Sequence, residues 1–93
     1  MTEQSNSSVQ TVGPELASAP LLVLTDSIHP VGGVAAISRI LAQPGHTGPV
    51  WLLATDAWSL VTGDNITAPL TAVPGLAYSL IFDGANWFPV GAP

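Results

Sequence analysis

Apolar residues occur in short segments along the chain, and turn-forming residues separate these segments. Nine glycines and nine prolines cut the sequence after residue 19 into pieces of about four to nine residues, which leaves no room for helices of ordinary length. The pieces are rich in Val, Ile, Leu, Thr and Trp, which favour strands. Strands are therefore predicted at Leu21–Thr25 and Val34–Leu41, with a short helix as the alternative for the second segment.

A first hairpin is predicted in the middle of the chain. Val50–Ala54 and Trp58–Thr62 are both apolar, and residues 55–56 provide a short reversal between them. Two such segments with a tight connection are typical of paired antiparallel strands.

A second hairpin is predicted near the carboxy end, where apolar residues alternate through Leu76–Phe82 and resume at Asn86–Val90. Asp83 and Gly84 stand between the two segments, and Asp-Gly in this position is a strong hairpin signal. We assign turn formation and packing in this region to Asp83, Gly84, Trp87, Tyr78 and Phe82.

Short strands at regular spacing predict an all-β fold, namely a small β-sandwich or barrel of short antiparallel strands. Residues 1–18 differ in composition, being rich in Ser, Thr, Gln, Asn and Glu. They are predicted to form a flexible or extended N-terminal arm, and residues 19–93 are predicted to form the β module.

The composition predicts association with other chains. Of the 93 residues, 47% are hydrophobic and only 8% are charged, so polar side chains would not cover a monomer. A domain this small usually needs a disulfide, a metal or a partner subunit. The chain has no cysteine, and its two histidines have no ligand-like neighbours. A homo-oligomer without metal or cofactor is expected, with a trimer favoured, and candidate interface residues are Arg39, Trp51 and Trp58.

The net charge of −5, with Arg39 as the single cation, excludes several partners. The sequence offers no basic patch for nucleic acid or for an anionic membrane. No apolar run approaches the length of a membrane span, and no signal peptide is recognisable. We therefore expect a protein made in the cytoplasm.

The sequence does not favour catalysis. It contains no cysteine, no lysine and no Gly-x-Ser-x-Gly motif, and these absences remove the common nucleophile arrangements. His29 and His46 lie beside prolines or glycines and are expected to be solvated loop residues. The aromatic residues are expected to pack in a core or an interface, and sugar stacking is the alternative. The chain is predicted not to be an enzyme.

The segments Gly63–Ile66 and Pro74–Trp87, with Leu70 between them, form a pattern that resembles small bacteriophage virion proteins and tail-fibre modules. In that pattern a Gly-Asp turn precedes a Pro-Gly strand, and an Asp-Gly hairpin ending in Trp closes the fold. The resemblance covers about the last 60 residues.

The resemblance implies a structural role on the outer surface of a virion. A short chain fits a capsid decoration, or cement, protein that oligomerises on the capsid and stabilises the head. Its partner would be the major capsid protein, and the arm would bind that protein through Val9, Val12 and Leu16. The alternative is a tail-fibre or head-fibre module that binds a glycan or receptor through aromatics near Trp87.

Overall fold

The computed structural model describes residues 12–46 and 48–90. This part of the chain forms ten strands and no helix, so the predicted all-β class is confirmed and no described segment is a candidate membrane-spanning helix. The strands are β1 (Leu16–Ala17), β2 (Leu21–Val23), β3 (Ile28–Gly32), β4 (Ala36–Ile37), β5 (Arg39–Leu41), β6 (Val50–Ala54), β7 (Ser59–Leu60), β8 (Leu70–Thr71), β9 (Ala77–Phe82) and β10 (Trp87–Val90).

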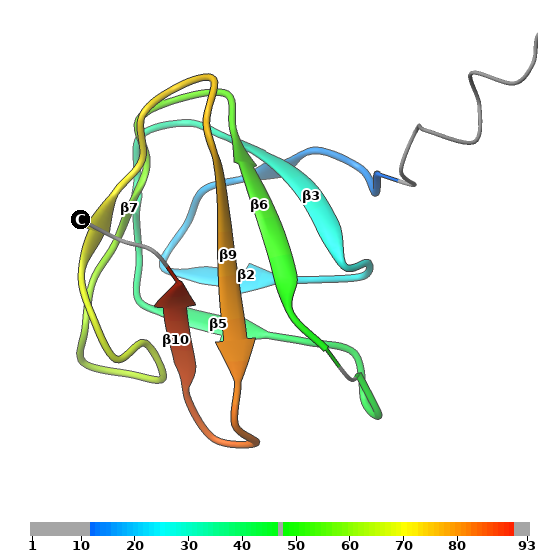
Figure 1. Ribbon diagram of the computed structural model, residues 1–93. Helices are drawn as coiled ribbons and strands as arrows, with labels where there is room; N and C mark the ends of the chain where they lie inside the picture. The colour runs from blue at the N-terminus through cyan, green and yellow to red at the C-terminus, as the bar shows by residue number, and fades with distance from the viewer. Residues whose placement is uncertain (1–11, 47, 91–93) are drawn as a thin grey trace, which may run out of the picture.

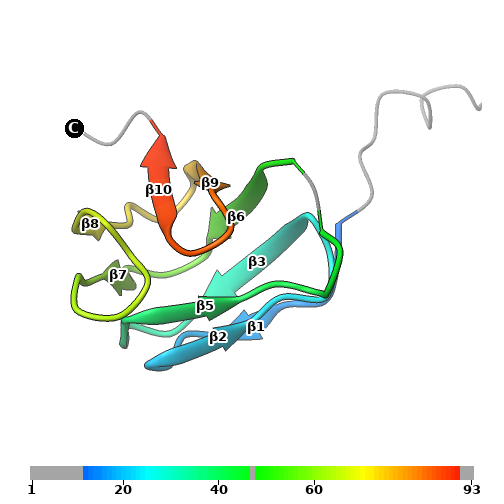
Figure 2. The ribbon, with the colours of Figure 1, turned by 90° about the horizontal axis from the view of Figure 1, so that it is seen from below.

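The strands form three sheets. A five-stranded sheet has the order β1-β3-β6-β9-β10, β2 pairs with β5, and a third sheet has the order β4-β7-β8. In Figure 1 β9 crosses in front of β2 and β5, and Figure 2 shows β2 and β5 below β3, β6 and β9 of the larger sheet. The core lies between the five-stranded sheet and the two smaller sheets.

The chain passes twice around the core in the same direction. The first pass contains β2, β3 and β4, and each pairs in parallel with β5, β6 or β7 of the second pass. With the parallel β1–β3 pair, four of the seven ladders are parallel. The predicted antiparallel pairing is thus found in three ladders. The other four differ from it because the short connections carry the chain to another sheet instead of reversing it within one sheet.

The predicted hairpin of Val50–Ala54 with Trp58–Thr62 does not form. β6 pairs with β3 and β9, whereas β7 pairs with β4 and β8. Thr55 continues beside β3, where its N–H and its hydroxyl donate to the Val31 carbonyl over 3.1 Å and 2.9 Å. The chain then crosses to the three-stranded sheet.

The predicted strand Val34–Leu41 is divided at Ser38 into β4 and β5, which belong to different sheets. The N–H groups of Ser38 and Arg39 both donate to the Pro20 carbonyl at 3.0 Å. This shared acceptor holds the chain where it leaves one sheet and enters the other.

The closing hairpin forms as predicted, with β9 and β10 antiparallel. Gly84 has a φ of +100°, and the Asp83 N–H donates to the Asn86 carbonyl at 3.1 Å. The Asp83 carboxylate accepts the N–H groups of Asn86 and Ala85 at 2.8 Å and 2.9 Å.

The strand β3 was not predicted, yet it lies inside the five-stranded sheet between β1 and β6. Its residues bond alternately to the two sides: the Val31 carbonyl accepts from Thr55, and the Gly32 carbonyl accepts from Ser18. By this alternation Pro30 faces the N-terminal segment, where β1 is only two residues long. Proline is tolerated here because the N–H that it lacks would point toward β1, which is too short to pair along all of β3.

The N-terminal segment joins the sheet before the predicted domain boundary at residue 19. The Gly13 N–H donates to the Ile28 carbonyl at 2.7 Å, and the Ser18 N–H donates to the Gly32 carbonyl at 2.8 Å. The Ser18 hydroxyl also accepts the Ala35 N–H at 3.0 Å. Residues 13–18 thus lie along β3, with Leu16–Ala17 as a strand of the five-stranded sheet, and residues 1–11 lie outside the described residues.

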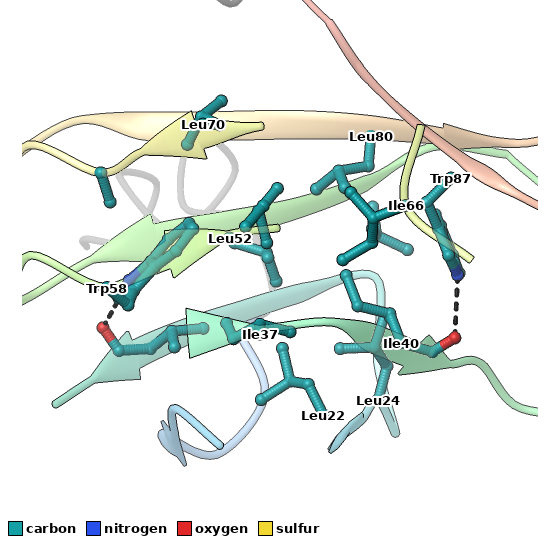
Figure 3. Close-up of a cluster of buried hydrophobic side chains, with 14 of the residues drawn as sticks. Leu22, Leu24, Ile37, Ile40, Leu52, Trp58, Ile66, Leu70, Leu80 and Trp87 are labelled. Carbon is teal, nitrogen blue, oxygen red and sulfur yellow. Dashed lines mark hydrogen bonds between the residues drawn. The ribbon is translucent and has the colours of Figure 1, made fainter. Parts of the chain in front are cut away.

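A tryptophan occupies each end of the core, as Figure 3 shows. Trp58 and Trp87 are both fully buried. The indole N–H of Trp58 donates to the Val31 carbonyl at 3.1 Å, and that of Trp87 donates to the Ile40 carbonyl at 2.9 Å. The two large rings therefore fill the core and also satisfy carbonyls that water cannot reach. Between them lie the buried side chains of Leu22, Leu24, Ile37, Leu52, Leu60, Ile66, Leu70 and Leu80, among others.

Residues 65–67 connect the two-stranded sheet of β2 and β5 to the five-stranded sheet. The Asn65 side chain pairs with β5 as another strand would, because its Oδ1 accepts the Ile40 N–H at 3.0 Å and its Nδ2 donates to the Ile40 carbonyl at 2.7 Å. On the other side the Trp87 N–H donates to the Asn65 carbonyl, and the Thr67 N–H donates to the Trp87 carbonyl. The free edges of β5 and β10 are thus joined.

Candidate interaction surfaces

The side of the five-stranded sheet that faces away from the core is apolar across four strands. Alternation along β3, β6, β9 and β10 sends every second side chain to this side, and the registers align them in rows across the sheet. We call this surface the outer face. Its residues are Ile28, Pro30, Trp51, Leu53, Ala77, Ser79, Ile81, Phe88 and Val90.

Large side chains on the outer face are well exposed. Ile81 is 52% exposed, Val90 44%, Phe88 42% and Trp51 39%. The one hydroxyl belongs to Ser79, which the register places between Trp51 and Val90 and which is itself buried. A contiguous apolar surface of a few hundred Å² is the size at which patches on monomers are often functional.

The charged side chains of the described residues lie at the rim of the outer face or away from it. Glu15 lies at the β1 edge, where its carboxylate accepts the Thr55 hydroxyl at 3.4 Å. Nearby, the Asp56 carboxylate accepts the Gly33 N–H at 3.1 Å. Asp83 lies at the tip of the closing hairpin.

A second apolar surface lies on the opposite side of the core, on the β2–β5 sheet. Leu21, Val23 and Leu41 are 46%, 49% and 39% exposed, and the register sets Val23 beside Leu41. Next to Leu21 in this register is Arg39, whose guanidinium lies 3.7 Å from the Asp64 carboxylate on the exposed surface. We call Leu21, Val23 and Leu41 the opposite patch.

The structure separates the three candidate interface residues. Trp51 lies on the outer face, and Arg39 lies beside the opposite patch, paired with Asp64. Trp58 is buried in the core, because it follows the crossover after residue 55 and enters between the sheets. It therefore presents no surface to another subunit, and its assignment to an interface is corrected.

The packing residues assigned near the closing hairpin lie together at the core. Phe82 stacks on Trp87 with ring centroids 4.6 Å apart, and Tyr78 meets Trp58 edge-on at 5.8 Å. The Tyr78 hydroxyl accepts the Val73 N–H at 2.9 Å. Because Trp87 is fully buried, it cannot stack on a sugar at the surface.

The three residues assigned to a capsid-binding arm have different positions. Val9 lies outside the described residues. Val12 is 46% exposed, whereas Leu16 in β1 packs against the chain's own core. Leu16 is therefore partly buried against its own fold, and its role in binding a neighbouring protein stays a prediction.

His29 is buried rather than solvated, which corrects the sequence expectation. Its Nε2 accepts the N–H groups of Thr25 and Asp26 at 3.0 Å each. Its Nδ1 lies 2.7 Å from the Pro14 carbonyl, which can only accept, so Nδ1 carries the proton. Both ring nitrogens are thus occupied, and His29 is no free base for the Thr25 hydroxyl, 3.5 Å from Nε2.

The second histidine offers no catalytic or metal site. Nε2 of His46 lies 3.0 Å from the Gly48 carbonyl within an exposed loop. In the described part of the chain no group of three His, Cys, Asp or Glu side chains is arranged to hold a metal ion.

Sequence reasoning missed the burial of His29 and the bridging role of Asn65. Pro30 suggested that His29 lies in a loop. The structure shows instead that residues 28–32 form the strand β3, in which His29 is at a buried position. Comparisons of the chain with protein-family models, with curated proteins and with solved structures found no match.

Proposed function

We propose that this chain is a non-catalytic structural module that assembles with copies of itself and decorates the outer surface of a virus capsid. The observation that carries the proposal is the pair of exposed apolar surfaces on opposite sides of one small core, the outer face and the opposite patch. A decoration protein needs one surface for its own copies and another for the capsid lattice. The resemblance of Gly63–Ile66 and Pro74–Trp87 to phage virion modules supports the same role.

In this proposal the protein forms a homo-oligomer, with a trimer favoured, that binds the major capsid protein and stabilises the head by binding only to the assembled state. Exposed Val12, at the N-terminal end of the described chain, supplies a further contact to the capsid.

A fibre or tail module that binds a glycan is the second candidate, because Trp51 and Phe88 are exposed on the outer face and aromatic rings stack on sugars. Sugar recognition also requires polar side chains that bond to hydroxyl groups. Ser79, the one polar side chain on that face, is buried, so the decoration role is favoured.

The number of copies per particle tests the proposal. Particles encoded by the same genome would be purified, and the protein would be counted against the major capsid protein by quantitative mass spectrometry. Hundreds of copies per particle are expected for a decoration protein. A few copies would favour the fibre or tail role, and absence from purified particles would overturn both.

A further inference from the structure

We infer, on the basis of the structural function proposed above, that the outer face is the surface through which copies of this chain contact one another. The exposed side chains of this face, Ile81, Phe88, Val90 and Trp51, are thus covered by the same face of a second copy. Contact with the capsid is then made by the opposite patch.

The placement of charge allows a second copy to cover the outer face. The net charge is −5, yet Glu15, Asp56 and Asp83 lie at the rim of the outer face and not within it. Two copies can therefore bring their apolar centres together without placing one carboxylate on another. A basic partner would find no acidic group at the centre, and a polar partner would leave its own groups without hydrogen bonds.

The edge of the sheet directs association to its face. β10 is the edge strand next to the outer face, and its Trp87 backbone groups are bonded to Asn65 and Thr67. Pro89, in the same strand, has no N–H to donate. A strand of another copy therefore finds few backbone groups to pair with at β10, and at this side of the sheet contact is left to the side chains of the outer face.

The outer face can form the apolar centre of an interface between copies. A stable interface buries about 800 Å² on each partner and has an apolar core inside a polar rim, and the exposed side chains of the outer face would supply that core. Three copies that turn this face toward a common axis would each bury it against two neighbours. The predicted trimer is compatible with this arrangement.

Matched lysine variants test the inference. Ile81→Lys places a charge on the outer face, and Val23→Lys places one on the opposite patch at a similarly exposed strand position, 49% against 52%. Both variants reduce the net negative charge equally, so general repulsion cannot explain a difference. Light scattering during size-exclusion chromatography should give a multiple of the chain mass for wild type and Val23→Lys, and the single-chain mass for Ile81→Lys.

A second variant and circular dichroism show whether a loss of association results from misfolding. Phe88→Ser should also weaken association at least tenfold, and circular dichroism should show that Ile81→Lys and Phe88→Ser keep the wild-type sheet signal. Salt provides an independent readout: association of two acidic chains through an apolar face should strengthen between 50 mM and 500 mM salt, taken as roughly the range over which screening becomes strong.

The outcomes separate this inference from the proposed function. If folded Ile81→Lys and Phe88→Ser remain oligomeric while Val23→Lys becomes monomeric, copies meet through the opposite patch and the inference is wrong. A monomeric wild type at micromolar concentration would also overturn it. The first result leaves the proposed function standing. A monomeric wild type would also contradict the homo-oligomer in that proposal, whereas the capsid role is tested separately by the copy number per particle.

Discussion

At the scale of single residues, the turn between β9 and β10 depends on the backbone of Gly84. Its φ of +100° lies in the region that favours glycine, and a Cβ added there would meet no atom within 4 Å. Gly84→Val should therefore act through backbone strain alone and lower the free energy of unfolding by about 1–3 kcal/mol. Urea unfolding followed by tryptophan fluorescence measures the change.

The neighbouring residue supplies the matched control for this substitution. Ala85 is exposed in the same turn and has no positive φ, so Ala85→Val adds the same side chain without the strain. Equal stabilities of the two variants would show that the turn does not need glycine.

Asp83 makes the same turn sensitive to acid. The N–H groups of Asn86 and then Ala85, bonded to its carboxylate, hold the pKa of Asp83 below its usual value of 3.8. Because the folded-state pKa is the lower one, the stabilisation is complete above pH 3.8 and is lost as the pH falls through the folded-state pKa. Asp83→Asn should therefore be less stable than wild type at pH 6, and the difference should shrink toward pH 2. Urea midpoints across this range check the trend, and a difference independent of pH would contradict it.

Single residues also show where sequence reasoning succeeds and where it stops. Asp83 and Gly84 were identifiable because their turn chemistry is local. The burial of Trp58 and the exposure of Trp51 were not, since both lie in apolar segments. Which side of a strand meets the core depends on strands that are distant in the sequence, and a period of two does not reveal it.

At the scale of elements, the segment around Asn65 acts as a short substitute for a strand. Its side chain satisfies both backbone groups of Ile40. Asn65→Ala should leave these groups without partners and cost about 1–3 kcal/mol. Asn65→Asp should cost at least as much, because a carboxylate oxygen would face the Ile40 carbonyl. Denaturant midpoints would measure both, and an Asp variant as stable as wild type would refute the pairing.

The strand β1 provides a further prediction, which concerns truncation. A chain that starts at Val12 keeps every contact of β1, whereas a chain that starts at Pro20 loses β1, the Ser18 bonds and the Pro14 carbonyl that His29 bonds. We expect the shorter chain to melt at least several degrees lower, since about 1 kcal/mol shifts the melting temperature of such a domain by about 4–8 °C. Equal melting temperatures for the two truncated chains would support the predicted boundary at residue 19.

Element prediction from the sequence was accurate for strand content and for the closing hairpin, but not for pairing. Val50–Ala54 was placed correctly as a strand, and its predicted partner was wrong. Parallel partners usually require a helical crossover, whereas here the crossover is made of short strands in the smaller sheets. The sequence contains no local signal for that arrangement.

At the scale of the whole molecule, the two ends of the core are held by similar hydrogen bonds from tryptophan side chains. Trp58 and Trp87 each bond a backbone carbonyl at opposite ends. Trp58→Phe and Trp87→Phe should each cost about 1–2 kcal/mol through the lost donor and volume. Because the sites share no partner, the costs should add to within about 0.5 kcal/mol. Unfolding of the double variant in two separate transitions would instead indicate two independent units.

Composition predicted the all-β class and the shortage of charge, and the structure shows where that shortage is concentrated. Asp56 and Asp83 lie in connecting segments, and the Glu15 carboxylate lies over Gly32 at one end of the outer face, away from its exposed aromatic side chains. Composition gives the number of charged residues but not their positions in the fold. Neither the outer face nor the opposite patch could therefore be predicted from the sequence.

The double passage of the chain around its core has a consequence for synthesis on the ribosome. The first pass, β2 to β4, finds its parallel partners only in the second pass, and β6 finds its antiparallel partner in β9. The nascent chain therefore cannot close its core until β9 and Trp87 have emerged, and synthesis proceeds at roughly 5–20 residues per second. Until then the leucines and valines of the first pass are open to chaperones.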